Sequence, residues 1–266
     1  MKEKQQEIGR WDGKSVAKAQ DFLAAEEPLE IRVDNHPVSV TMRTPGNDEE
    51  LAVGFFITEG LLKKRADILK IAPHPRNQNK NVVNVFLAPD IVVNLEQLTR
   101  HVFASSSCGL CGKATIESVH QHFPKIKTKV SVNVKIISAL PDKLRAAQET
   151  FARTGGLHAA AIFDLDGNLI VLREDVGRHN AVDKVLGNCF LAGNFPLEKN
   201  ILLVSGRASF EILQKALAAR IPIVCAVSAP SSLAVDFARE SGQTLIGFLR
   251  EERMNVYSHP KRIKFA

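Results

Sequence analysis

The sequence contains little of what marks secreted and membrane-spanning proteins. It has only 4 cysteines in 266 residues: Cys108 and Cys111 are close together, while Cys189 and Cys225 stand alone in apolar runs. This pattern is a poor disulfide framework and suits a reducing compartment. No apolar run is long enough to span a membrane, and residues 1–13 are polar and lack the apolar core of a signal peptide. We therefore expect a cytoplasmic protein without disulfides and without a membrane partner.

The composition excludes a disordered or fibrous chain. Hydrophobic residues make up 45% and charged residues 24% of the sequence, which is typical of globular proteins. The length suits one large domain or two modest ones. The 35 basic and 29 acidic side chains give a net charge of +6, which favours an anionic partner but is too small to indicate nucleic acid. We therefore expect a globular protein that does not bind nucleic acid.

The first half of the chain predicts a smaller, mixed α+β domain. Residues 1–20 show no periodicity, and we expect them to form a flexible tail. The N-terminal domain then covers residues 21–138 and includes a small, polar loop at 103–113. Alternating apolar residues and helix-start chemistry predict strands at 29–33, 38–42 and 82–87 and a helix from Asp48 to about Gly60. A basic, strand-like stretch at 125–137 closes this half.

The second half, residues 139–266, predicts a three-layer α/β domain. Pro141 is expected to open a helix that continues through Phe151 and ends at the glycine pair 155–156. A hairpin is predicted over 159–173. The remainder alternates strands at 201–204, 223–227 and 244–249 with helices at 180–191, 209–219 and 232–240. Because the apolar runs of these strands are continuous, we expect a largely parallel sheet covered by helices on both faces.

Three strand-to-helix turns in this half are rich in small, hydroxyl and basic residues. Such turns meet at the carboxyl ends of parallel strands, where ligands bind to helix N-termini. We predict that Arg178 and Arg207 bind phosphate groups and that the carboxylate of Asp175 or Asp183 accepts a hydrogen bond from a base or a ribose. The other candidates in these turns are His179, Ser205, Gly206, Ser228 and Ser231. The alternative is that these residues only cap helices, as Ser, Asp and Asn commonly do.

A further candidate, His158, follows a double glycine at the start of a predicted strand. Its position resembles that of the histidine in the His-x-Glu motif of zinc deaminases, but Ala160 stands where those enzymes carry the essential glutamate. We therefore do not expect deaminase chemistry, even if the fold is similar. His158 either lines the ligand pocket or is an ordinary buried histidine.

The segment from Cys108 to Cys111 lies in a glycine-flanked loop just before a predicted helix. The helix terminus and Lys113 both favour the thiolate form, which predicts a reactive thiol. A structural zinc site is one alternative, but the nearby histidines do not have the usual spacing, and we expect no zinc. A thioredoxin-like redox motif is another alternative. Cys189 and Cys225 are predicted to be inert core residues.

Near the C-terminus, Arg250 and Arg253 lie close together at the end of a predicted strand. Two neighbouring guanidinium groups are suited to phosphate oxygens, which makes this strand end a candidate anion site. The alternative is a solvated, basic terminus.

Six motifs lie in order along the chain. They are SSSCGLCGK at 105–113, TGGLHAA at 154–160, REDVGRHNAVDK at 173–184, SGRASFE at 205–211, SAPSSLA at 228–234 and GFLREERMNVY at 247–257. Together they resemble the FdhD/NarQ family of formate dehydrogenase accessory sulfurtransferases. The resemblance covers nearly the whole chain from about Pro28 onward.

The resemblance implies a cytoplasmic homodimer whose C-terminal domain has a cytidine-deaminase-like fold. It implies a sulfur carrier that takes sulfur from a cysteine desulfurase. The sulfur then passes to the molybdenum cofactor, bis-molybdopterin guanine dinucleotide, before that cofactor enters formate dehydrogenase. By the same resemblance, Cys108 would hold the persulfide and Cys111 would assist or resolve it.

The family's cofactor-binding stretch corresponds to one short segment of this sequence. Its residues are Phe248, Leu249, Arg250, Glu251, Glu252 and Arg253. A guanine nucleotide is expected to mimic the bound cofactor there. The alternative function is a non-catalytic chaperone that binds the molybdenum cofactor and docks on formate dehydrogenase without covalent chemistry.

Overall fold

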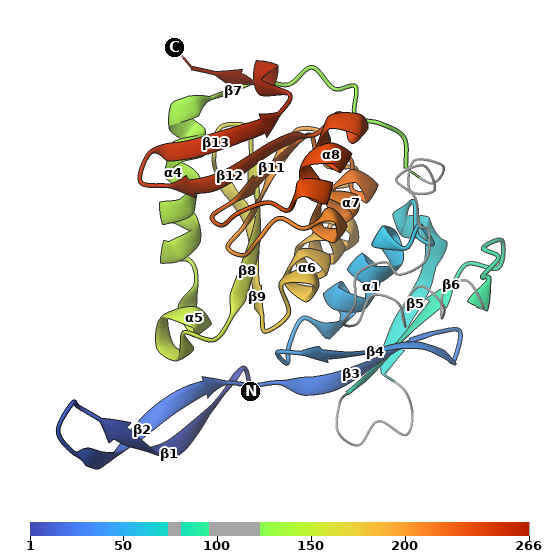
Figure 1. Ribbon diagram of the computed structural model, residues 1–266. Helices are drawn as coiled ribbons and strands as arrows, with labels where there is room; N and C mark the ends of the chain where they lie inside the picture. Colours follow the sequence, from blue (N-terminus) through green and yellow to red (C-terminus); the bar gives the residue numbers. More distant parts are fainter. Residues whose placement is uncertain (74–80, 96–122, 266) are drawn as a thin grey trace.

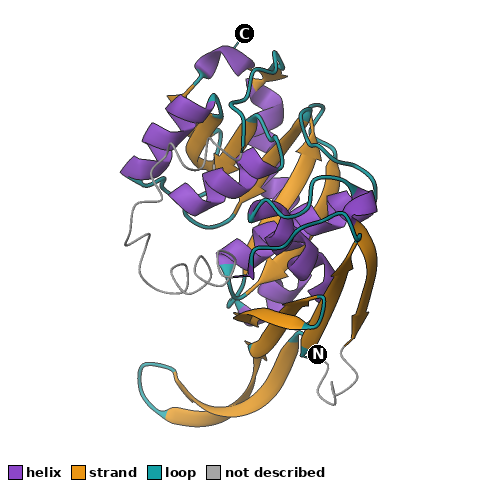
Figure 2. Ribbon diagram, turned by 90° about the vertical axis from the view of Figure 1, so that its right-hand side faces the viewer, coloured by secondary structure: helices purple, strands orange, loops and turns teal. Residues whose placement is uncertain are grey.

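The computed structural model describes residues 1–73, 81–95 and 123–265, which form two α/β parts packed side by side and a hairpin that projects from them (Figures 1 and 2). The first part comprises residues 27–95 and the second part residues 123–265. Cys108, Cys111 and the whole loop at 103–113 lie outside the described residues. The fold is mixed α/β, as the sequence predicts.

The first part is a four-stranded sheet with one helix against its face. Its strands, in the order β4-β3-β6-β5, are β3 (Glu27–Val33), β4 (His36–Arg43), β5 (Ile68–Pro73) and β6 (Val82–Leu87). A short 3-10 helix, η1 (Arg65–Asp67), precedes β5. α1 (Asp48–Thr58) shares a buried cluster with these strands, in which Leu51 and Phe56 join Leu29, Ile31 and Val85. The strands and the helix predicted for this region are confirmed.

The second part is built on one six-stranded sheet. Its strands, in the order β13-β12-β11-β10-β8-β9, are β8 (His158–Asp164), β9 (Leu169–Asp175), β10 (Asn200–Val204), β11 (Ile223–Ala226), β12 (Thr244–Arg250) and β13 (Arg253–Ser258). Among neighbouring strands of this sheet, only β10 with β11 and β11 with β12 pair in parallel. The prediction of a largely parallel sheet is therefore wrong at the flanks, because the tight turns after β8 and β12 return the chain antiparallel.

Helices cover both faces of this sheet. Alternate residues of β8 belong to different buried clusters: Ala161 and Phe163 pack with α4 (Val134–Ala146), and Ala160 and Ile162 pack toward the opposite helices. Those helices are α6 (Arg178–Leu191), α7 (Phe210–Ala218) and α8 (Ser232–Ser241). Because strand side chains alternate between faces, the sheet is buried on both sides, which explains the continuous apolar runs.

The two parts meet where α1 packs on α6. The helices approach so closely that a Cβ at Gly54 would lie 1.9 Å from the carbonyl oxygen of Asp183, and one at Gly187 would lie 1.9 Å from the carbonyl oxygen of Glu50. Any larger side chain at either position would push the helices apart. Two glycines on facing helices therefore set the distance between the parts.

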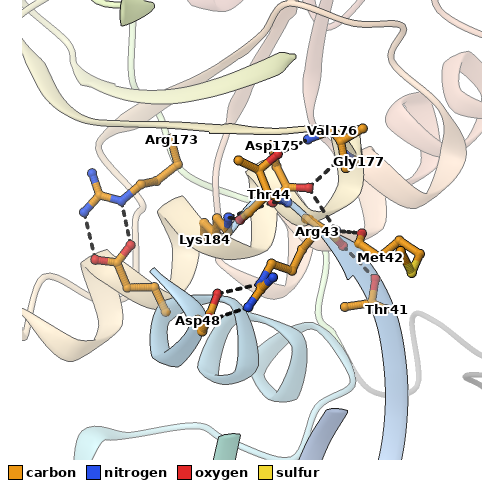
Figure 3. A network of polar contacts seen from close by, with 12 residues as sticks. Thr41, Met42, Arg43, Thr44, Asp48, Arg173, Asp175, Val176, Gly177 and Lys184 are labelled. Atoms are coloured by element: carbon orange, nitrogen blue, oxygen red, sulfur yellow. Dashed lines mark hydrogen bonds and ion pairs between the residues drawn. The ribbon is translucent and has the colours of Figure 1, made fainter. Parts of the chain in front are cut away.

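A buried ion pair fixes the same junction (Figure 3). Lys184 Nζ on α6 lies 2.6 Å from Asp175 Oδ2 at the end of β9 and also donates to the carbonyl oxygen of Thr44, 2.8 Å away. The backbone N–H of Thr44 donates to Asp175 Oδ2 at 3.1 Å, and Thr44 Oγ1 accepts from the backbone N–H of Val176. Thr44 follows β4, so this network ties the end of the first sheet to the end of β9.

Two bidentate ion pairs flank this network (Figure 3). Arg173 on β9 donates to both carboxylate oxygens of Glu50 on α1, at 2.6 and 2.8 Å. Arg43 donates to both oxygens of Asp48, at 2.9 Å each, and is itself buried. Bidentate geometry makes these the stronger class of charge-assisted hydrogen bond. The junction between the parts is therefore polar and ordered as well as closely packed.

Residues 1–20 do not form the unstructured tail that the sequence predicts. They belong to an antiparallel hairpin of β1 (Glu3–Trp11) and β2 (Val16–Ala24), which extends away from both parts (Figure 1). None of its side chains is buried, and most are exposed. No buried face imposes an apolar alternation on these strands, so the periodicity by which strands are recognised is missing.

The predicted helix start at Pro141 is also wrong. α4 begins at Val134 because the Asn133 side chain caps it by accepting from the backbone N–H of Lys135 at 2.8 Å. Pro141 lies inside α4, and a separate helix, α5 (Glu149–Thr154), ends at Gly155 with a positive φ of 65°. α4 packs on the second sheet, so the second part already includes the residues from 123 onward.

Little of the basic stretch at 125–137 is strand. Only β7 (Val132–Asn133) pairs, in parallel with β14 (Ile263–Lys264), which follows a second 3-10 helix, η2 (Pro260–Arg262). Residues 125–131 lie outside any helix or strand, and residues 134–137 already belong to α4. Among the described residues, no helix is both long enough and apolar enough to cross a membrane.

The Lys184–Asp175 pair predicts a large loss of stability for Lys184→Met. Removing the ammonium leaves the Asp175 carboxylate buried without its counter-charge, and we expect the free energy of unfolding to fall by about 3–5 kcal/mol. Urea unfolding measures the change. The exposed Lys199→Met serves as control, and the double variant Asp175→Asn/Lys184→Met should recover part of the loss. Equal stability of Lys184→Met and Lys199→Met would contradict the assigned role.

Candidate functional site

The predicted site residues converge at one end of the second sheet. Strands β10, β11 and β12 run in parallel and end there, β9 also ends there, and β8 begins there, since His158 lies opposite Asp175 and Ala160 lies opposite Val204. We call this end of the sheet the carboxyl end. The loops that leave it contain all three turns singled out from the sequence.

The turn after β10 is fastened to the start of β8. Ser205 Oγ accepts from the backbone N–H of Ala159 at 2.8 Å, and the backbone N–H of Ser205 donates to the carbonyl oxygen of Ala159 at 2.9 Å. The Ser205 side chain is therefore engaged in structure. A Cβ at Gly206 would lie 3.3 Å from His158 Nδ1 and 3.7 Å from Arg178 Cβ, so glycine permits this close approach. The structure thus brings His158, Arg178 and Gly206 together.

The turn after β11 is held against the turn after β10. The backbone N–H of Ala208 donates to the carbonyl oxygen of Ala229, and the backbone N–H of Ser231 donates to the carbonyl oxygen of Ala208. Ser231 Oγ accepts from the backbone N–H of Ala234 at 3.2 Å. The capping alternative is therefore confirmed for Ser231, whose hydroxyl serves as the N-cap of α8.

Residues 248–253 form the tip of the β12–β13 hairpin, at the same end of the sheet. The backbone N–H of Phe248 donates to the carbonyl oxygen of Ser228 at 3.1 Å, which fixes the tip to the turn after β11. Phe248, Glu251 and Glu252 adopt positive φ angles of 52°, 50° and 63°. For Glu251 and Glu252 these angles are those of a two-residue hairpin turn, as at Asp34 and Asn35 between β3 and β4.

The side chains of this tip divide by burial. Leu249 is buried in the core beside α4 and does not face solvent. Arg250 and Arg253 are exposed and lie opposite each other across the hairpin. Phe248, Glu251 and Glu252 are exposed as well. The tip therefore presents one aromatic ring, two guanidinium groups and two carboxylates outward.

Arg178 has an unsatisfied donor. Its Nε is buried and has no hydrogen-bond partner among the described residues. Buried donors are almost always paired, so such an atom calls for a partner beyond the described residues. An anionic oxygen of a ligand would satisfy it.

The histidines beside Arg178 are kept neutral. Burial lowers the pKa of His158, and the positive charges of Arg178 and Arg207 lower it further against an opposing effect of Asp175. Burial, followed by the charges of Lys215, Arg178 and His158, lowers the pKa of His179 to about 3. The charge at the carboxyl end is therefore carried by arginines.

His179 is anchored on α7. Its Nε2 lies 3.2 Å from Ser209 Oγ and 3.3 Å from Glu211 Oε2. Burial raises the pKa of Glu211. Behind this pair, Lys215 Nζ donates to both oxygens of Asp183, at 2.9 Å each, and to Thr58 Oγ1 at 3.1 Å. A buried polar chain therefore runs from His179 into the α1–α6–α7 interface.

The prediction that Asp175 or Asp183 accepts from a base or ribose is wrong. Both side chains are buried, and each is paired with a lysine that the sequence analysis did not single out: Lys184 for Asp175 and Lys215 for Asp183. One signal was available, because each lysine lies in a helix most of whose buried residues are apolar, although Asn180 and Asn188 lie one turn from Lys184 and Glu211 lies one turn from Lys215. A lysine in that position usually has a buried carboxylate partner.

The two cysteines within the described residues are buried, as predicted. Burial raises the pKa of Cys189 to about 11 and that of Cys225 still further. Neither thiol is suited to nucleophilic chemistry. Within residues 1–73, 81–95 and 123–265, no cluster of three or more His, Cys, Asp or Glu side chains could hold a metal ion.

Comparison with known proteins gives consistent results. The model of the FdhD/NarQ family matches residues 24–264. A sulfur carrier protein FdhD from Streptomyces avermitilis is 50% identical over 257 residues, covering 94% of this chain and 91% of the relative. A protein of the same name from Mycobacterium tuberculosis is 51% identical over 253 residues, covering 91% of this chain and 92% of the relative.

A solved structure has the same fold. The crystal structure of a protein described as a formate dehydrogenase accessory protein from Desulfotalea psychrophila superposes with a TM-score of 0.79. It is 25% identical and covers 98% of this chain and 99% of that chain.

The neutral His179 predicts a pH dependence of stability. Below the ordinary pKa of 6.5, the unfolded chain binds a proton that the folded chain does not take up until about pH 3. Stability from this group is therefore complete above pH 6.5 and is lost as the pH falls, by about 2 kcal/mol at pH 5. Urea unfolding at pH 7 and pH 5 should show a smaller loss for His179→Gln than for the unmodified protein. Identical losses would contradict the assignment.

Proposed function

Because the chain belongs to the FdhD/NarQ family, we propose that it is a sulfur carrier that delivers sulfur to the molybdenum cofactor of formate dehydrogenase. The names of its relatives support sulfur transfer, and the description of the Desulfotalea structure supports a role with formate dehydrogenase. The substrate is bis-molybdopterin guanine dinucleotide. The donor is a cysteine desulfurase.

One observation supports this proposal most strongly. At the carboxyl end, Arg178 and Arg207 flank a neutral His158, and the buried Arg178 Nε has no partner among the described residues. A guanine dinucleotide carries phosphate groups that match these donors. The exposed Arg250 and Arg253 at the hairpin tip add two further guanidinium donors at this end, beside Glu251 and Glu252. We propose that the phosphates bind at this end and that Phe248 contacts the base or pterin.

The sulfur chemistry is assigned to Cys108. Its thiolate attacks the outer sulfur of the desulfurase persulfide, the S–S bond breaks, and the desulfurase cysteine leaves as a thiolate. Cys108 then carries the persulfide, with no net oxidation or reduction. Cys111 assists or resolves this species. Cys189 and Cys225 are unsuitable carriers because both are buried.

Further parts of the proposal follow from family membership. We propose that the protein acts in the cytoplasm as a homodimer and that its second part is related to cytidine deaminases. Helices on both faces of a mixed sheet support this relationship. Ala160 occupies the position where the deaminases need glutamate, so the fold would be used here for binding.

Persulfide formation tests the proposal. Incubation of the full chain with a cysteine desulfurase and cysteine should add the mass of one sulfur atom, measured by intact-protein mass spectrometry. Cys108→Ala should abolish the adduct because the nucleophile is removed, whereas Cys189→Ala should retain it.

Maturation of formate dehydrogenase separates the two functions. If the protein is a sulfur carrier, Cys108→Ala abolishes maturation. If Cys108→Ala/Cys111→Ala supports normal maturation while Arg250→Gln/Arg253→Gln does not, the chain is a non-catalytic cofactor chaperone and the sulfur carrier is ruled out.

Nucleotide affinity tests the phosphate assignment. GDP should bind the full chain, and Arg178→Gln or Arg207→Gln should weaken binding about 10–100-fold, because each removes a charge-assisted hydrogen bond worth about 1.5–3 kcal/mol. Isothermal titration calorimetry measures the affinities. Arg239→Gln on the outside of α8 is the matched control and should bind normally. If all three variants bind GDP equally, the phosphates lie elsewhere.

A further inference from the structure

A concave surface lies at the opposite end of the sheet from the proposed cofactor site. It is a groove of about 620 Å³ lined by residues 126–131 and 259–262. Thr244, the first residue of β12, donates from Oγ1 to the carbonyl oxygen of His259 at 2.9 Å, and the backbone N–H of Ile126 donates to the carbonyl oxygen of Ser241 at 2.7 Å. The groove therefore lies where the parallel strands begin, and we call it the amino-end groove.

The lining of the amino-end groove is strongly basic. Lys127, Lys129, Lys261 and Arg262 contribute to it, together with His259, and none of its lining residues is acidic. The three lysine side chains are exposed. Since a cluster of one sign attracts the opposite charge, the groove suits an anionic partner.

One wall of the groove is an extended chain without a strand partner. Ile126 and Val132 are buried, whereas Lys127, Lys129 and Ser131 are exposed, which is the alternation of a strand with one covered face. The backbone N–H groups of residues 127–130 donate to no acceptor among the described residues. Such a segment is a template to which another strand can add.

The groove is held in shape by Arg262. Its Nε donates to the carbonyl oxygen of Thr128 at 3.2 Å, and its Nη1 donates to Thr244 Oγ1 at 3.2 Å. This side chain bridges the two walls. The extended wall then continues into β7, which already pairs with β14. A groove fixed in this way loses little freedom when a partner binds.

We propose that the amino-end groove binds an extended, acidic segment of a partner protein as an added strand. Backbone hydrogen bonds to residues 127–131 supply affinity. Asp or Glu at alternate positions of the segment pair with Lys127, Lys129 and Lys261. An acidic peptide fits better than a nucleic acid, because no Phe, Tyr or Trp side chain lines the groove for base stacking and the free groups are backbone donors. This proposal does not depend on sulfur transfer.

A labelled peptide tests the charge requirement. The probe is a fluorescein-labelled nine-residue peptide of alternating Glu and Val, and its binding to the full chain is measured by fluorescence anisotropy at low salt. Lys127→Glu/Lys129→Glu should weaken binding at least tenfold, whereas the matched control Lys63→Glu/Lys64→Glu, two exposed neighbouring lysines of the first part, should bind within twofold of the unmodified protein. Lys261→Glu provides an independent variant on the other wall.

N-methylated peptides test the added strand. A strand offers its N–H groups to one edge at alternate residues, so methylation of one alternating set should weaken binding at least tenfold and methylation of the other set should not. Amide hydrogen exchange of residues 127–131 should slow when the unmethylated peptide binds.

Three results would overturn the proposal. Equal binding by the charge-reversed and control variants would remove the groove as the site. Equal binding by both methylated peptides would mean that the peptide binds by charge attraction alone and does not add as a strand. Tighter binding of a single-stranded DNA oligonucleotide, lost in the same variants, would identify a nucleic-acid surface instead.

Discussion

The buried pair between Lys184 and Asp175 is the interaction on which the rest of the arrangement depends. Asp175 ends β9 and also accepts from the backbone N–H of Gly177 at 2.8 Å and from the Asn180 side chain at 3.1 Å. These contacts set the start of α6, and therefore the positions of Arg178 and His179. Through Thr44, the same carboxylate holds the first part against the second. A single ionised group thus couples domain packing to the geometry of the candidate site.

The carboxyl end is suited to anion binding because one buried donor beside that network, Arg178 Nε, has no partner among the described residues. The chain supplies partners for Asp175, Asp183, Lys184 and Lys215, all of which are buried. It leaves the buried Arg178 Nε without a partner among the described residues. A fold that satisfies nearly every other buried polar group around that atom favours binding of an anion there. The exposed arginines of the β12–β13 tip lie at the same end, which suits a ligand with more than one phosphate.

Sequence patterns predicted most of the fold because a helix or strand with one buried face carries apolar residues at regular spacing. The strands β3, β6, β8, β10, β11 and β12, and the helices α1, α6, α7 and α8, all have a core face. The hairpin of β1 and β2 has none, so its sequence looked like a tail. Pro141 appeared to start a helix because proline favours that position, but the Asn133 cap lies earlier in the chain and determines the true start. The local sequence alone does not show which of Asn133 and Pro141 starts the helix.

The candidate site was predictable in its location but not in its detail. Parallel strands must end together, so the convergence of the three turns followed from their order along the chain. The contacts of Asp175 with Thr44 and of Asp183 with Thr58 did not, because each joins residues more than a hundred positions apart in sequence. Ser231 illustrates the same limit, since a capping serine and a ligand-binding serine look alike until the hydrogen bond is seen.

A crystal structure of the full chain with bound GDP tests the central claim most directly. The account predicts a phosphate oxygen within about 3.2 Å of Arg178 Nε, at the carboxyl end of the second sheet. A nucleotide bound at any other surface, with Arg178 Nε still unpaired, would contradict it.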